Sequence, residues 1–180
     1  RLLVTNKHNV TGRNIQTGDC LDTKNAAIPN NLGVLIPITK KHKKGFTCAD
    51  WQRFSIPLYP EDKGGSPAWV EHPDPLVDLV GFKFAPKEIN IERLVLPADG
   101  YDIPVNLCSS VNIIGYPFGV STDNFPLWIT GHIASEPAID INGRPLMYID
   151  SRTRQGQSGS PVVKFYNPGE SVHIDGKTYQ

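Results

Sequence analysis

The chain has 180 residues, which suits one compact domain or two small β-barrels that share an interface. Its 18 basic and 18 acidic residues balance, so there is no overall field to attract nucleic acid or an acidic membrane surface. The sequence contains no run of about 18 apolar residues, the length needed to cross a bilayer, and we expect neither nucleic acid nor a membrane as a partner.

Many short strands joined by turns are expected throughout the chain. Glycine and proline each occur 16 times, and long apolar-periodic segments are absent. This pattern favours an all-β fold of about ten to twelve strands. The odd number of widely spaced cysteines indicates neither a disulfide framework nor a metal site, and we expect three buried free thiols. They are Cys20, Cys48 and Cys108.

The first histidine of interest follows the first expected strand, at residues 1–5. His8 lies just beyond its end, where a base for a catalytic serine could be presented. Residues 12–31 are predicted to form a long loop. The charged run at 40–45 is interpreted as a solvated hairpin tip. Further strands are predicted at Leu32 to Ile38, Trp51 to Tyr59 and Ala68 to His72.

An acidic residue interrupts the apolar run from Leu76 to Phe84. Asp78 in this setting is expected to be buried, and a buried carboxylate is costly unless it is paired. An imidazole is a suitable partner, although an aspartate that caps a turn at a strand end would also fit. Asp74 is the rival acid, but its flanking prolines favour a turn.

An irregular, proline-containing segment at 85–107 is interpreted as the connection between two barrels. We therefore expect an N-terminal barrel at 1–95, a linker at 96–107 and a C-terminal barrel at 108–180. His132 is interpreted as a packed or hydrogen-bonded strand residue, and 141–144 as a hairpin turn. Later strands are predicted at Val111 to Gly115, Leu127 to Glu136, Pro145 to Asp150 and Val162 to Tyr166, followed by a short strand and the start of another.

A serine framed by glycines precedes the strand at Val162. In Gly156-Gln157-Ser158-Gly159-Ser160-Pro161, the glycines allow a sharp turn that can place backbone N–H groups beside the hydroxyl of Ser158. A simple Gly/Ser/Pro turn would have the same composition. An α/β-hydrolase elbow is disfavoured because Ser160 replaces its last glycine and its acid and histidine should follow the serine. The catalytic partners are therefore expected upstream.

Three segments, in the order histidine, aspartate, serine, resemble those of chymotrypsin-fold serine proteases. The segment Thr5-Asn6-Lys7-His8 is similar to the bacterial glutamyl endopeptidases and high-temperature-requirement proteases. Asp78-Leu79-Val80 and the Ser158 segment resemble the family's acid and nucleophile segments. Residues 114–119 and 129–133 are also similar to bacterial members, so the resemblance spans about residues 1–166.

The resemblance implies two six-stranded-type antiparallel β-barrels and a serine endopeptidase that needs no cofactor or metal and acts on polypeptides. His8 and Asp78 would come from the first barrel and Ser158 from the second. Ser158 is then the nucleophile, His8 the general base, and Asp78 the residue that fixes the imidazole tautomer. The N–H groups of Gly156 and Ser158 would form the oxyanion hole.

The resemblance leaves specificity and completeness open. Thr153 and His173 stand at the offsets from Ser158 that recognise glutamate in glutamyl endopeptidases, so they are candidates for a specificity pocket. Strands that usually precede His8 and follow the Ser158 strand are missing, so we expect a fragment truncated at both ends. A protease-like binding or sensor domain is the alternative function, and a non-enzymatic β-sandwich would separate His8 from Ser158. The sequence assigns no compartment.

Overall fold

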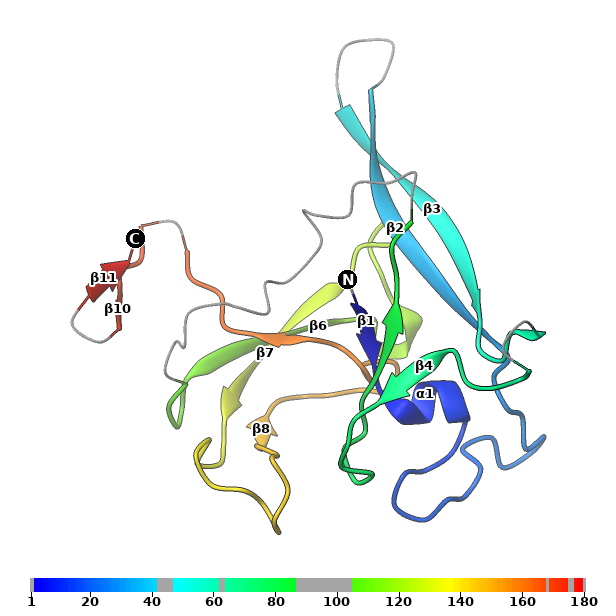
Figure 1. The fold of residues 1–180 in the computed structure, drawn as a ribbon. Helices are drawn as coiled ribbons and strands as arrows, with labels where there is room; N and C mark the ends of the chain where they lie inside the picture. Colours follow the sequence, from blue (N-terminus) through cyan, green and yellow to red (C-terminus); the bar gives the residue numbers. More distant parts are fainter. Residues whose placement is uncertain are drawn as a thin grey trace. The chain divides into compact units, whose positions relative to one another are not determined.

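The computed structural model describes residues 2–41, 47–61, 64–86, 105–167, 169–174 and 177–179. For residues 39–41, 47–49, 172–174, 177 and 179 it describes the backbone alone. The chain divides into two compact units, Arg1–Val95 and Leu96–Gln180. Figure 1 shows the helices and strands of the two units.

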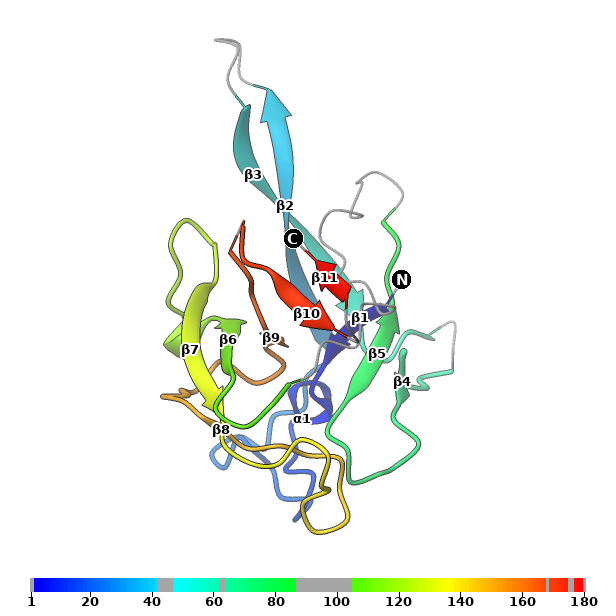
Figure 2. The same ribbon diagram turned by 90° about the vertical axis from the view of Figure 1, so that its left-hand side faces the viewer.

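The first unit contains a three-stranded antiparallel sheet and a short helix. Its strand order is β1-β5-β4, with bounds Leu2–Thr5 for β1, Val80–Lys83 for β5 and Trp69–Glu71 for β4. The helix α1, Lys7–Thr11, follows β1 almost at once. Figure 2 shows β1, β5 and β4 side by side, in agreement with their pairing.

A long hairpin completes the first unit. Strands β2 (Asn31–Lys41) and β3 (Thr47–Pro57) pair with each other along their whole length. The core lies where the base of this hairpin meets the three-stranded sheet and α1. Its buried members are Val10, Leu58, Trp69, Val80 and Phe82, with Leu3, Leu32, Ile56 and Ala68 packed against them. Val10 therefore anchors α1 in the core two residues after His8.

The second unit is built on a four-stranded antiparallel sheet in the order β8-β7-β6-β9. The central strands are β6 (Ser110–Gly115) and β7 (Leu127–Ile133), and the edge strands are β8 (Ile149–Asp150) and β9 (Val162–Val163). Val111, Ile113 and Ile133 are the buried apolar side chains of this sheet. The segment that carries Ser158 connects β8 to β9, so it passes from one edge of the sheet to the other (Figure 1).

A separate two-stranded sheet ends the chain, formed by β10 (Val172–Ile174) and β11 (Lys177–Tyr179). Before β8, the predicted turn at 141–144 is present. Ile141 and Arg144 exchange both backbone hydrogen bonds, and the two central residues, Asn142 and Gly143, have φ of 53° and 71°. Such positive φ values are what an Asn-Gly type I′ turn requires.

The prediction of an all-β fold is confirmed, since the regular elements of the described residues are mostly strands, with almost no helix. Their sheets are open rather than closed into barrels. The helix α1 was not foreseen, because its five residues are too few to show a helical period. Several predicted strands are shorter than expected: β7 ends at Ile133, β8 has two residues and β9 has two. The predicted linker at 96–107 lies outside the described residues except for its last three.

The expectation of buried thiols is wrong for two cysteines. Cys108 is exposed and Cys20 is half-buried, and both are free. Cys108 also has a φ of 63°, which places it in a turn just before β6 rather than in a packed strand. The side chain of Cys48 lies outside the described residues.

Candidate functional site

Strand pairing brings the first histidine to the aspartate. Antiparallel β1 and β5 are in register with Thr5 opposite Val80, so the chain after β1 runs beside the chain before β5. His8 and Asp78 occupy those two segments. Seventy residues of sequence therefore separate two side chains that the sheet places next to each other.

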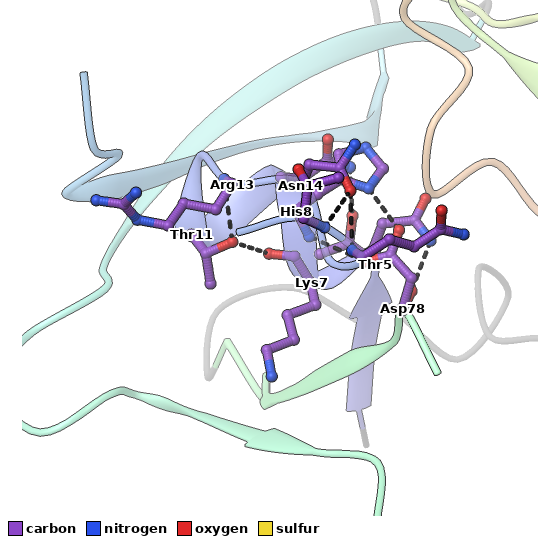
Figure 3. Close-up of polar contacts among 11 residues, drawn as sticks. Thr5, Lys7, His8, Thr11, Arg13, Asn14 and Asp78 are labelled. Carbon is purple, nitrogen blue, oxygen red and sulfur yellow. Dashed lines mark hydrogen bonds and ion pairs between the residues drawn. The ribbon is translucent and has the colours of Figure 1, made fainter. Parts of the chain in front are cut away.

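Two hydrogen bonds join His8 to the carboxylate of Asp78 (Figure 3). The backbone N–H of His8 donates to Oδ1 at 3.0 Å, and the ring nitrogen Nδ1 lies 2.5 Å from Oδ2. A third bond reaches the main chain of the acid, because Asn6 Nδ2 donates to the carbonyl oxygen of Asp78 at 2.6 Å. Both carboxylate oxygens and the main-chain carbonyl of Asp78 are thus held by the segment 6–8.

This geometry fixes the chemical role open to the imidazole. A carboxylate can only accept, so a bond to neutral His8 requires the proton on Nδ1 and leaves Nε2 as the acceptor. The side chains of His8 and Asp78 keep 23% and 26% of their exposure, so the pair is partly shielded from water. An imidazole with an accepting Nε2 and an acid behind it can act as a general base.

Local contacts hold α1 so that His8 keeps this position. Thr11 Oγ1 donates to the Lys7 carbonyl (Figure 3). Asn9 Nδ2 donates to Thr5 Oγ1. Gly12 ends the helix in the left-handed conformation, with φ 66°, and its N–H donates to the His8 carbonyl at 3.0 Å. A Cβ at this glycine would meet the Ala27 carbonyl oxygen at 2.9 Å, so only glycine fits this C-terminal cap.

An ion pair also ties α1 to β4. Lys7 Nζ donates to Glu71 Oε2 at 2.6 Å, and Trp69 Nε1 donates to Glu71 Oε1 at 3.3 Å. The Lys7 hydrogen bond is the main cause that holds the pKa of Glu71 below its ordinary 4.5. Burial opposes this shift, and the Trp69 bond adds to it. Because the lowered pKa belongs to the folded state, the ionised carboxylate stabilises the fold.

The stabilisation by Lys7 and Glu71 is expected to depend on pH. It is complete above the ordinary pKa of 4.5 and is lost as the pH falls through the lowered value. Since Glu71 is partly exposed, Lys7→Met is expected to cost only about 0.2–1 kcal/mol at neutral pH. Urea unfolding of Lys7→Met and of the control Lys24→Met, at pH 7 and pH 3, measures this. A Lys7→Met deficit that persists undiminished at pH 3 would contradict the assignment.

Asp78 is not placed as the sequence suggested. It lies in the loop just before β5, and its side chain is half-buried, so the expectation of a buried carboxylate is wrong. Residues 72–79 form the loop between β4 and β5, so the first part of the apolar run from Leu76 is not a strand. Asp74, the rival acid, belongs to that loop, where its Oδ1 accepts the Leu76 N–H at 2.9 Å. The turn interpretation of Asp74 is therefore correct.

Main-chain hydrogen bonds organise the loop that carries Ser158 and join it to a neighbouring segment of the second unit. Gln157 N–H donates to the Arg154 carbonyl at 3.3 Å, and Ser160 N–H donates to the Gln157 carbonyl at 3.0 Å. Phe118 N–H donates to the Gln155 carbonyl at 2.6 Å from the short 3-10 helix η3 (Pro117–Gly119). Beyond the loop, β9 pairs with β6, which fixes its far end.

The two glycines that frame Ser158 have conformations that other residues rarely adopt. Gly156 has φ 91° and Gly159 has φ 81°. A Cβ on Gly156 would lie 2.5 Å from the Tyr116 carbonyl oxygen and 3.3 Å from the Phe118 nitrogen. The residue itself is exposed, as is Ser158. The sharp turn expected from the sequence is therefore present at these residues.

A buried glutamine supports the same loop. Gln157 is 7% exposed, and its Oε1 accepts the Arg154 N–H at 2.6 Å. Its Nε2 has no hydrogen-bond partner among the described residues. Gly115 at the end of β6 leaves room for this packing, because a Cβ there would lie 2.1 Å from Ser160 Oγ and 3.6 Å from Gln157 Cγ. Gln157 could not be selected from the sequence, since glutamine between glycine and serine carries no signal of burial.

Three further residues were selected from the sequence: Thr153, His173 and His132. Thr153 is exposed, and its carbonyl oxygen accepts from the side chain of Arg154 at 3.0 Å. His173 lies in β10 opposite Thr178, and its side chain falls outside the described residues. The specificity pocket stays a prediction. His132 is exposed on β7, so the packed alternative of the packed-or-hydrogen-bonded interpretation is wrong.

Within the described part of the chain, no three histidine, cysteine, aspartate or glutamate side chains cluster as a metal site would require. The helices described there are all too short or too polar to cross a bilayer.

Comparisons of this chain with protein-family models, with curated proteins and with solved structures found no significant match to any of them.

Proposed function

We propose that this protein is a serine endopeptidase in which Ser158, His8 and Asp78 act as a catalytic triad. Ser158 Oγ attacks the carbonyl carbon of a peptide bond, while His8 takes the hydroxyl proton and passes it to the amine that leaves as the C–N bond breaks. Water, activated by the same imidazole, then hydrolyses the acyl-serine ester. Asp78 keeps the His8 tautomer and stabilises the imidazolium.

The observation that carries this proposal is the His8–Asp78 pair. A histidine and an aspartate selected by sequence, seventy positions apart, are joined by two hydrogen bonds, one of them through Nδ1. A histidine that merely packed in a core would not need its ring and its own backbone N–H bound to one carboxylate. An oriented imidazole with Nε2 accepting is what activation of a hydroxyl requires.

The Ser158 loop gives separate support. The positive φ values of Gly156 and Gly159 and the exposure of Ser158 suit a hydroxyl presented beside backbone donors. The Gln157 N–H is already used by the Arg154 carbonyl, whereas the N–H of Gly156 has no backbone acceptor among the described residues. Gly156 and Ser158 are the donors proposed for the oxyanion hole. The chymotrypsin-like pair of barrels is part of the same proposal, with the acid and base from one unit and the nucleophile from the other.

A fluorophosphonate probe tests the proposal, because it modifies only a serine whose hydroxyl is activated. The intact chain is expected to gain one adduct, and Ser158→Ala and His8→Ala are expected to abolish it. Ser121→Ala removes an exposed serine of the same unit and should leave the adduct in place. Undiminished labelling of Ser158→Ala would overturn the proposal. A folded chain that neither reacts nor cleaves casein would favour a binding or sensor domain.

A further inference from the structure

Asn6, two residues before His8, does not make the side-chain hydrogen bond that its position at the start of α1 would favour. Asn6 is the N-cap residue of α1, with φ −69° and ψ 145°, and asparagine at that position ordinarily accepts a hydrogen bond from the first turn of its own helix. Here the side chain makes no capping bond. Its Nδ2 instead donates to the main-chain carbonyl of Asp78 at 2.6 Å.

With this bond, both the side chain and the main chain of Asp78 are held by hydrogen bonds. The Asp78 carboxylate is held by the N–H and ring of His8, and the carbonyl of the same residue is held by Asn6. Asp78 lies in the loop before β5, two residues before the strand begins at Val80. Without Asn6, the main-chain carbonyl of Asp78 would lose this donor. The backbone nearby would then be held by the Asp78 carboxylate and by Leu79, whose N–H donates to the Val77 carbonyl and whose carbonyl accepts from the His72 N–H.

We propose that Asn6 is a positioning residue, which fixes the backbone of Asp78 so that its carboxylate stays aligned with Nδ1 of His8. The proposal deepens the peptidase assignment and rests on it for its effect on catalysis. The Asn6 side chain binds the Asp78 carbonyl instead of capping α1, so the start of the helix has no side-chain cap. A small misalignment of such a pair lowers the fraction of molecules in a reactive geometry.

Two substitutions separate positioning from capping. Asn6→Ser and Asn6→Asp both provide N-cap residues as good as asparagine, so a helix-capping role would survive in each. Serine is too short to reach the Asp78 carbonyl, and aspartate has no proton to donate to it. Asn14→Ser is the matched control, because among the described residues the Asn14 amide oxygen accepts from Gln16 and Thr17, both within its own loop.

The measurement is the Nδ1 proton signal of His8 in NMR spectra of the full chain with ¹⁵N-labelled histidine, assigned with His8→Gln. This readout does not depend on peptide hydrolysis, so it tests Asn6 even if the peptidase assignment fails. The signal is expected to be sharp in the unmodified chain and in Asn14→Ser, and to be broadened or lost in both Asn6 variants. An unchanged signal in Asn6→Ser would overturn the proposal.

The rate of catalysis supplies the second readout. Both Asn6 variants are expected to lower kcat about tenfold and to leave KM unchanged, because only the alignment of the base is affected. A change in KM alone, or full kcat in Asn6→Ser, would overturn the role in catalysis. An unmodified chain without any probe labelling would overturn the peptidase assignment instead.

Discussion

Asp78→Asn is expected to slow the reaction of Ser158 with a fluorophosphonate by about 10⁴-fold, the effect of this change in the triad template. The asparagine oxygen can still accept the His8 N–H, but its NH₂ group would face Nδ1. An amide donor there favours the tautomer with the proton on Nε2, and that tautomer cannot act as a base toward a hydroxyl. The initial rate of adduct formation, followed by intact-mass spectrometry, measures the effect.

Asp74→Asn is the matched control for this substitution. Asp74 lies four residues earlier in the same loop, and its Oδ1 accepts the Leu76 N–H, a role that an amide oxygen retains. Its adduct should form at the unmodified rate. Circular dichroism of both variants establishes that each is folded. A rate for Asp78→Asn within tenfold of the unmodified chain would contradict the role given to the acid.

Gly156→Ala is expected to abolish labelling of Ser158 and to destabilise the second unit. Alanine at φ 91° costs about 1–2 kcal/mol in backbone strain alone. The added Cβ would also lie 2.5 Å from the Tyr116 carbonyl oxygen, a main-chain atom that cannot move aside without shifting the chain before η3. The loop must then move, and the N–H of residue 156 moves with it. Probe labelling and thermal unfolding measure the two effects.

Gly169→Ala is the control that separates the steric clash with Tyr116 from the backbone strain of a positive φ. Gly169 has the same φ of 91°, but a Cβ there would meet nothing within 4 Å. This control should lose only the strain energy and keep its labelling. Equal labelling by Gly156→Ala and Gly169→Ala would show that the close approach to Tyr116 is not needed for the reactive loop.

The sequence by itself determined the all-β class and several local features. Strands and turns are signalled by residues that lie close together in the sequence. The sequence therefore located β1, the pair β6 and β7, and the Asn142-Gly143 turn without a structure. His8, Asp78 and Ser158 could also be selected from the sequence, because each lies in a short segment with characteristic neighbouring residues. A sharp turn at Gly156 was expected from its composition, and the structure shows that this turn has a positive φ.

Tertiary structure decided how those residues are held. The register of Thr5 opposite Val80 joins His8 to Asp78, and no local pattern encodes a pairing across more than seventy residues. The five-residue helix α1 exists because Val10 is buried in the core and Gly12 caps it, not because its sequence has a helical period. The use of the Asn6 amide depends on a carbonyl from a distant loop. Long-range contacts of this kind arise only when separate strands pack together, so a sequence can nominate such residues but cannot place them.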